Sequence, residues 1–179
     1  IGIGDDTAAW TGSDAIQLAT TDSMVENVHF SFDWCTWEEL GHKSLAVNLS
    51  DIAAMGGAAL YALVSLSCPD DIDSDSVVSY YHGMTRLAKD NGVVIAGGNL
   101  TRSPFVTSSV FVMGESPTGR LLRRASARAG DLVAVTGSLG AAAAALSMLN
   151  REGSRPNNMP EPLRQALVRP HARLTEGLQ

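Results

Sequence analysis

TWEELGHKSLAVNLSDIAAMGG, residues 36–57, encodes a long helix that is apolar on nearly every side. Thr36 is a typical N-cap residue, and Glu39 three positions later completes a capping box. Gly56 and Gly57 supply the signal that ends the helix. Because apolar residues fill most positions between these ends, we predict a helix that is buried on most sides and organises the elements around it.

One polar stripe interrupts this apolar surface. Ser44, Asn48 and Asp51 are spaced i, i+4 and i+7, so they project from a single face of the helix. A buried carboxylate is costly unless it is paired or binds a metal. The helix alone leaves two interpretations of Asp51 equally good: it pairs with a neighbouring backbone group, or it belongs to a functional site.

The composition is that of an acidic globular protein. The 179 residues are 45% hydrophobic, with a formal net charge of -6 and a pI near 5.1. The sequence has no basic run interleaved with aromatics and no apolar run near the roughly 20 residues of a membrane span, so we expect neither a nucleic-acid nor a membrane partner. Cys35 and Cys68 are isolated, which predicts two reduced thiols and a cytoplasmic location.

Alternating strand and helix patterns predict an α+β fold with α/β-like alternation, built on a mixed sheet. Helices are expected over 36–57 and 73–91, and strands over 1–6, 15–19, 61–67, 93–96 and 106–113. A change of composition near residue 117 predicts a domain over 1–117, followed at 118–179 by the incomplete beginning of a second, α/β domain. That second unit should hold a buried strand over 132–136 and helices over 141–149 and 163–168.

Carboxylates are expected where these elements end. Asp5 and Asp6 follow the first strand, Asp22 follows the second, and Asp51 lies on the polar stripe. Together they suit a hard cation such as Mg²⁺, which prefers oxygen ligands and keeps phosphate oxygens in its shell. The alternative is that these residues are ordinary turn and capping residues.

Two further features could bind phosphate. Gly97 and Gly98 follow an apolar strand directly, so they form either a phosphate-binding backbone turn or a simple turn between strands. Arg123 and Arg124 could grip a phosphate with their guanidinium groups, or could be solvated loop residues.

Taken in order, the motifs resemble those of the thiamine-monophosphate kinase family, which belongs with aminoimidazole ribonucleotide synthetase and selenophosphate synthetase. The resemblance covers nearly the whole chain, and we expect the chain to be a fragment that lacks the extreme N-terminus and most of the C-terminal domain. The segments that carry it are GIGDD at 2–6, TTD at 20–22, VHF at 28–30, KSLAVNLSDIAAM at 43–55 and the glycine pair at 97–98.

The resemblance implies ATP-dependent phosphorylation of thiamine monophosphate to thiamine diphosphate, in a homodimer whose N-terminal sheets pair into a barrel. It implies several Mg²⁺ ions, with Asp22 and Asp51 at the catalytic centre and His29 at the thiamine substrate. The implied nucleotide contacts are Gly97, Gly98, Asn99 and Arg124. The implied metal ligands are Asp6, Thr20, Thr21, Asp22, Asp51 and Asn99.

Asn99 departs from the family pattern, which has an aspartate at this position. A neutral amide oxygen is a weaker Mg²⁺ ligand than a carboxylate, so one metal should be held less tightly. The alternatives are another ATP-using enzyme of the superfamily, of the selenophosphate synthetase or hydrogenase-maturation type, or a non-catalytic module that binds nucleotide and Mg²⁺ and dimerises.

Overall fold

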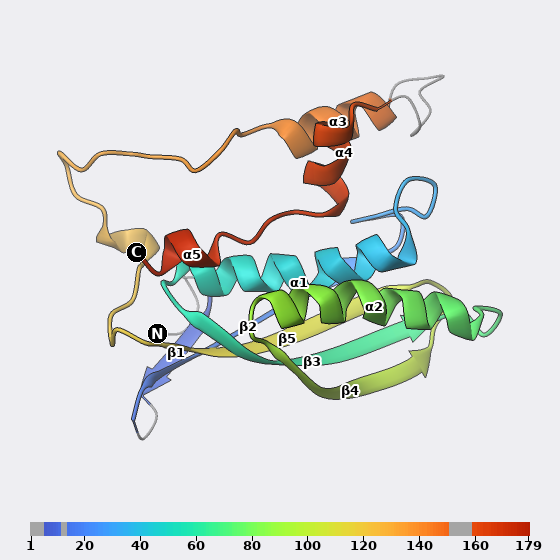
Figure 1. Ribbon diagram of the computed structural model, residues 1–179, viewed down its shortest axis with the longest axis horizontal. Helices are drawn as coiled ribbons and strands as arrows, with labels where there is room; N and C mark the ends of the chain where they lie inside the picture. The colour runs from blue at the N-terminus through green and yellow to red at the C-terminus, as the bar shows by residue number, and fades with distance from the viewer. Residues whose placement is uncertain (1–5, 12–13, 151–158) are drawn as a thin grey trace.

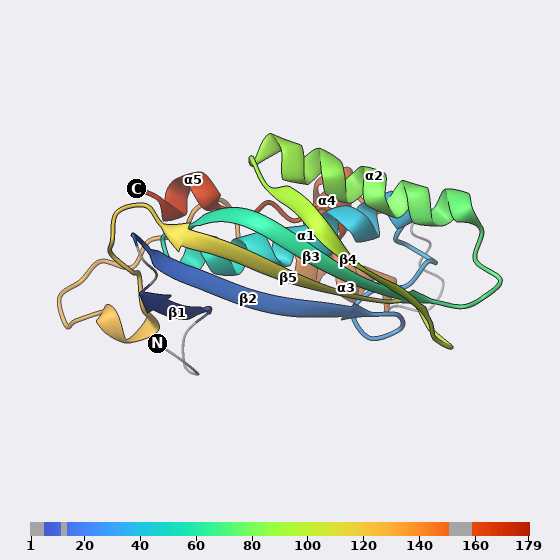
Figure 2. The same cartoon turned by 90° about the horizontal axis from the view of Figure 1, so that it is seen from below.

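The computed structural model describes residues 6–11, 14–150 and 159–179, in which one sheet carries helices on a single face (Figures 1 and 2). The strand order is β1-β2-β5-β3-β4. Strands β3 and β4 pair in parallel and the other neighbours are antiparallel, which confirms the expected mixed sheet. The strands are β1 (Ala8–Thr11), β2 (Ile16–Val25), β3 (Ala58–Cys68), β4 (Val94–Arg102) and β5 (Thr107–Ser116).

The two long helices begin where their caps predict. In α1 (Trp37–Ala54), Thr36 accepts a hydrogen bond from the Glu39 amide, and Glu39 in turn accepts one from the Thr36 amide. In α2 (Ser74–Asp90), the N-cap Asp73 accepts a hydrogen bond from the Ser76 amide. Local sequence therefore determines both starting points.

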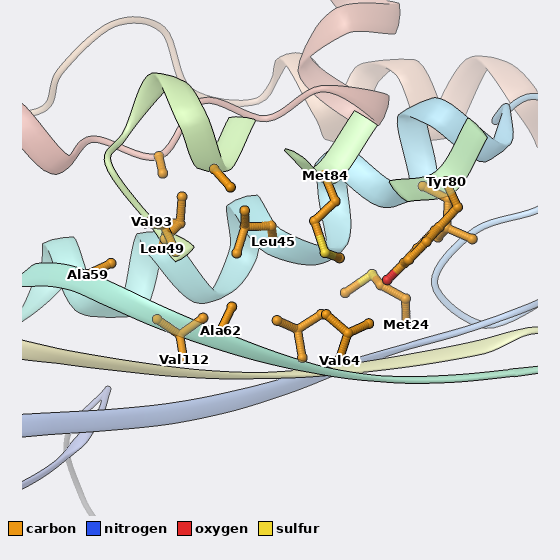
Figure 3. Packing of buried hydrophobic residues seen from close by; sticks show 14 of the residues in the cluster. Met24, Leu45, Leu49, Ala59, Ala62, Val64, Tyr80, Met84, Val93 and Val112 are labelled. Carbon is orange, nitrogen blue, oxygen red and sulfur yellow. The ribbon is translucent and has the colours of Figure 1, made fainter. Parts of the chain in front are cut away.

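The core lies between these two helices and the inner face of the sheet (Figure 3). Leu45 and Leu49 of α1 and Met84 of α2 point toward Ala62 and Val112 of the sheet, and all five are buried. The opposite face of the sheet carries none of the described helices (Figure 2). Tyr61 and Leu63 of β3 remain 51% and 46% exposed on that open face.

Helices α1 and α2 cross in close contact at two glycines. A Cβ atom on Gly41 would overlap the carbonyl oxygen of Tyr80, and a Cβ atom on Gly83 would overlap that of Glu38. Only the absence of a side chain allows the two backbones to approach so closely. The position of α1 over the sheet therefore depends on residues in α2.

Several boundaries differ from the sequence-based expectations. Strand β2 continues to Val25, so residues 20–22 lie inside the strand and not after it, and β1 was not expected at all. Strand β4 runs through Gly97 and Gly98, where the pairing with β3 is irregular, so these glycines are not a turn. A Cβ atom on Gly98 would overlap the carbonyl oxygen of Val64, which explains the glycine as a packing requirement.

The expected buried strand over 132–136 is wrong. This stretch has no regular structure, and Leu132 and Val133 are 96% and 101% exposed, because no strand of the described residues pairs with it. The expected strand over 1–6 and the carboxylate of Asp5 lie outside the described residues, apart from Asp6.

After the sheet come the short helix η1 (Arg124–Ser126) and three more helices, of which α4 and α5 return to α1 (Figure 1). Arg164 of α4 binds Glu39 with Nη1–Oε1 and Nη2–Oε2 distances of 2.6 and 2.8 Å. Next to it, Arg169 Nη2 lies 2.8 Å from Glu38 Oε1. Two acidic residues of the first turn of α1 therefore anchor the later part of the chain. The three helices are α3 (Ala141–Leu149), α4 (Glu161–Val168) and α5 (Leu174–Gly177).

The helix crossing can be tested with Gly83→Ala. Alanine favours a helix by about 1 kcal/mol over glycine, but here the added methyl overlaps the Glu38 backbone. We expect the free energy of unfolding to fall by about 1–3 kcal/mol, measured by chemical denaturation. Thr85→Ala, on the exposed side of α2, is the control and should change it by less than about 0.5 kcal/mol. An unchanged or higher stability of Gly83→Ala would contradict the close crossing.

Candidate functional site

The candidate site lies where β2 runs beneath the second half of α1. The side chain of Thr20 points to the inner face of the sheet, and its hydroxyl donates a hydrogen bond to Asp51 Oδ2 at 2.7 Å. The same Oγ1 atom lies 3.3 Å from the carbonyl oxygen of Asp6. The structure therefore brings Asp6, Thr20 and Asp51 together, although 31 residues separate Thr20 from Asp51 in the chain.

Arg124 lies at this cluster and binds Asp6 with two nitrogens. Its Nη2 is 2.5 Å from Asp6 Oδ1 and its Nε is 3.3 Å from Oδ2. The arginine side chain is 65% exposed, so it approaches the cluster from solvent. A guanidinium that reaches in from the surface can neutralise negative charge there, and it can also contact an incoming anion.

Like charges surround Asp51. Its pKa is raised above the ordinary value of 3.8, mainly by burial and also by the nearby carboxylates of Asp22 and Asp6. The Thr20 hydrogen bond and the charge of Arg124 act in the opposite direction without cancelling the effect. Three carboxylates and one guanidinium thus leave an excess of negative charge at the end of α1.

Asn48 was placed on the polar stripe by the sequence, but its role depends on tertiary structure. Its side chain is fully buried, and Oδ1 accepts a hydrogen bond from the Asp22 amide at 2.9 Å. Its Nδ2 donates to the carbonyl oxygen of Ser44, also at 2.9 Å. The amide side chain therefore ties the main chain of β2 to α1 beside the carboxylates.

The ligand types in this cluster suit a hard cation, since carboxylate and hydroxyl oxygens are the groups that Mg²⁺ accepts. Among the described residues, however, no three His, Cys, Asp or Glu side chains are already arranged as a metal site. Arg124 holds Asp6 in the observed arrangement, so a metal would require that ion pair to open or shift. The residues fit Mg²⁺ in chemistry, with the carboxylates near one another but not closed around a single point.

His29 lies apart from this cluster. It is exposed in the loop after β2, where its Nδ1 accepts a hydrogen bond from the Val25 amide at 3.1 Å. Lys43 of α1 donates to the His29 carbonyl at 3.3 Å. Because Lys43 precedes Asp51 by eight positions, the two regions are about 12 Å apart along the helix. The Nδ1 contact leaves Nε2–H as the exposed donor of a neutral His29.

Thr21 and Asn99 lie on the open face of the sheet. Thr21 Oγ1 donates to the Val110 carbonyl at 3.0 Å, so its hydroxyl does not join the cluster formed by its neighbour Thr20. Asn99 pairs in register with Ser65, and β4 is three strands away from β2. At the usual strand spacing this separation is about 14 Å. One chain therefore does not bring Asn99, Gly97 or Gly98 to the carboxylates.

The open face is hollowed between β4 and β2. A shallow pocket of about 410 Å³ lies there. Its lining includes apolar and hydroxyl side chains together with Asn99, and consists of Thr21, Leu63, Val64, Ser65, Gly98, Asn99, Ser109 and Phe111.

Residues 4–116 match the family model for the N-terminal domain of AIR synthase related protein. The chain belongs to this family. The match spans the whole described sheet together with α1 and α2, so the carboxylate cluster lies inside the AIR synthase related domain, except for Arg124.

Similar proteins within this family share a single description. The chain is 39% identical over 163 residues to a thiamine-monophosphate kinase of Bacillus subtilis, and 38% identical over 173 residues to that of Aquifex aeolicus. These alignments cover 90% and 97% of this chain, but 50% and 54% of the relatives. The chain thus spans about half the length of the curated relatives that it matches.

A solved structure of AaThiL complexed with AMPPCP and TMP superposes with a TM-score of 0.87 at 37% identity. The superposition covers 98% of this chain and 56% of the AaThiL chain. This agreement confirms the expected α+β fold.

No helix in the described parts of the chain is long and apolar enough to cross a membrane.

Asp51→Asn tests the carboxylate cluster. The substitution keeps an oxygen that can accept from Thr20, and it removes the charge that Asp6 and Asp22 oppose. We expect the free energy of unfolding at pH 7 to stay the same or to rise by up to about 1 kcal/mol. We also expect the binding of Mn²⁺, used as a probe for Mg²⁺ and measured by calorimetry, to be lost.

The control is Asp90→Asn, which removes an exposed carboxylate at the end of α2 and should leave Mn²⁺ binding unchanged. Collapse of the fold in Asp51→Asn, or full retention of Mn²⁺ affinity, would contradict the role assigned to Asp51.

Proposed function

We propose that this chain supplies the N-terminal, catalytic-site portion of a thiamine-monophosphate kinase, which transfers a phosphoryl group from ATP to thiamine monophosphate. The observation that carries the proposal is the cluster of Asp6, Asp22, Asp51 and Arg124 where β2 meets α1. The names of the relatives and the AMPPCP and TMP bound to AaThiL support this substrate pair.

The chemistry of this reaction matches an acidic site without a strong base. The acceptor is a phosphate monoester with a second pKa of about 6, so it is already largely ionised at neutral pH. The barrier arises from bringing anions together, and bound Mg²⁺ ions would supply the neutralising charge and the in-line alignment. Asp6, Asp22, Asp51 and Thr20 would hold these ions in this chain.

The remaining predicted residues have separate roles in the proposal. Arg124 would exchange its contact with Asp6 for a phosphate of the nucleotide, because it reaches the cluster from solvent. His29 would offer its Nε2–H to the thiamine part of the acceptor, about 12 Å from the carboxylates along α1. Thiamine monophosphate is an elongated molecule, so a separation between the phosphate and thiamine contacts is expected.

We further propose that two copies of the chain pair through their open sheet faces. Tyr61 and Leu63 give that face an exposed apolar surface without a covering helix among the described residues. Within one chain, Asn99 lies about 14 Å from the carboxylates, which is too far for it to bind the same metal ion as they do. The cluster faces α1 on the other side of the sheet, so Asn99 of a second copy would reach it around the edge of β2 beyond Ala19.

The alternatives predict different substrates. A selenophosphate synthetase or hydrogenase-maturation activity would consume ATP with another acceptor, and a binding module would bind nucleotide without turnover. Similarity to thiamine-monophosphate kinases at 38–39% identity favours the thiamine enzyme.

The two free cysteines keep the cytoplasm as the expected compartment.

The activity is tested by measuring Mg²⁺-dependent ADP release and thiamine diphosphate formation, with this chain and with any longer protein that contains it. We expect thiamine diphosphate to form with thiamine monophosphate as the acceptor and to disappear when EDTA removes the metal. Tight ATP binding without turnover would support the binding module, while ATP consumption only with selenide or another acceptor would support the alternative enzymes.

The proposed dimer is tested with Leu63→Glu, which introduces a charge on the open face, where Leu63 lines the pocket. Burial of an unpaired carboxylate in an interface is unfavourable, so we expect dimers to dissociate to monomers in light scattering. Val78→Glu is the matched control, because Val78 is 50% exposed on α2 and lies on the helical side of the sheet. A monomeric wild type, or a dimeric Leu63→Glu variant, would contradict this interface.

A further inference from the structure

Asn48 links two backbones beside the carboxylate cluster without carrying charge. It accepts a hydrogen bond from the Asp22 amide and donates one to the Ser44 carbonyl, and its side chain is fully buried. Asp51 lies three positions later on the same face of α1. Asn48 therefore connects the strand position of Asp22 to the helix that carries Asp51.

The edge of β2 explains why such a link is needed. Strand β1 pairs with β2 only as far as Ala19, so beyond that point the edge has no strand partner among the described residues. The Asp22 amide is directed to Asn48 and not to a neighbouring strand on that edge. An open edge allows Asp22 to face solvent and ligand, but it also leaves that side of the strand without a ladder, while the other side pairs with β5.

A second hydrogen bond that joins β2 to α1, between Thr20 and Asp51, depends on a residue of the site itself. Thr20 reaches α1 through the Asp51 carboxylate, so a ligand that takes this oxygen competes with the tie. The Asn48 amide neither titrates nor uses a carboxylate oxygen, and its contact with β2 is to the main chain. Its hold on Asp22 can therefore persist when the carboxylates change partners.

We propose that Asn48 is a positioning residue, which fixes the Asp22 backbone against α1 so that the Asp22 and Asp51 carboxylates keep the spacing needed to bind a divalent cation together. The proposal rests on the metal-binding role given to these carboxylates in the proposed function. Residues that orient metal ligands through hydrogen bonds commonly change metal affinity by about 10- to 100-fold when they are replaced.

Two substitutions separate the two hydrogen bonds of Asn48. Asn48→Leu has a similar volume and removes both of them. Asn48→Ser can still bond to the Ser44 carbonyl within the helix, because serine commonly bonds to the carbonyl four residues earlier, but it is too short to reach Asp22. Both variants should lose amide protection at Asp22, and both should bind Mn²⁺ about 10- to 100-fold more weakly.

Two controls distinguish positioning from a general loss of stability. Leu45→Ala removes core packing from the same helix without touching Asp22, and should weaken folding while leaving Mn²⁺ affinity within about twofold of wild type. Asn91→Ser alters the C-cap residue of α2, whose Nδ2 donates to the carbonyl four residues earlier, as that of Asn48 does. The Asn91 side chain makes no hydrogen bond to a strand of the described residues, so Asn91→Ser should leave Mn²⁺ binding unchanged.

The experiment combines hydrogen–deuterium exchange at the Asp22 amide with Mn²⁺ titration of each folded protein, followed by electron paramagnetic resonance. Slow exchange at Asp22 in wild type, lost in Asn48→Ser together with Mn²⁺ affinity, would support the proposal. It is overturned if wild-type Asp22 exchanges as fast as exposed loop amides. It is also overturned if wild type does not bind Mn²⁺, if Asn48→Ser binds it normally, or if Leu45→Ala weakens binding equally.

These readouts do not require catalysis. A wild-type protein that binds Mn²⁺ through the Asn48-dependent arrangement, but does not phosphorylate thiamine monophosphate, would refute the proposed activity and leave the positioning role supported. If neither Asn48 variant folds, exchange at Asp22 in wild type with and without Mn²⁺ decides the question, since the proposal requires protection in both states.

Discussion

The hydrogen bond between the Thr20 hydroxyl and the Asp51 carboxylate, 2.7 Å long, is the contact on which the arrangement of the site depends. Helix α1 is apolar on most sides, so its one polar stripe must lie where polar partners exist. The edge of β2 beyond Ala19 provides them, because this edge has no strand neighbour among the described residues and offers backbone groups as well as side chains. The hydrophobic packing of α1 thereby determines where the carboxylates meet.

At the other end of α1, one charged side chain, that of Glu39, also has two structural roles. Burial alone would raise the pKa of Glu39, but hydrogen bonds from Arg164 and from Thr36 outweigh this effect and lower it. One carboxylate thus completes the capping box of α1 and anchors α4. Because α4 is attached at the beginning of α1 while Asp51 lies near its end, this helix connects the later part of the chain to the candidate site.

Local signals in the sequence were sufficient for some elements and insufficient for others. The beginning of α1 was predictable because Thr36 and Glu39 interact within one turn, and the stripe of Asn48 and Asp51 follows from helical spacing alone. The extent of β2 was not predictable from local signals. Thr20 and Asp22 are polar and resemble the end of a strand when their partners in α1 are unknown. Gly98 resembled a turn residue, although its purpose is to let β4 approach the Val64 carbonyl. The location of Asn99 relative to Asp22 depends on strand order, which no local pattern encodes.

The carboxylate cluster has an energetic cost that folding alone does not explain. Burial and two neighbouring carboxylates raise the pKa of Asp51, so its ionised form is less stable in the folded chain than in water. For a carboxyl group with a raised pKa, this cost develops as the pH rises from the unfolded-state pKa to the folded-state pKa, and it is fully present above the latter. Arg124 offsets part of the cost, but it does so from an exposed position where solvent weakens its effect. A ligand that binds only the folded state adds stability in proportion to its occupancy, and a cation is the kind of ligand that this excess of negative charge selects. The placement of Asp6, Asp22 and Asp51 at the β2–α1 junction therefore has two consequences. It causes repulsion between like charges, and it creates the proposed site for metal-bound phosphates.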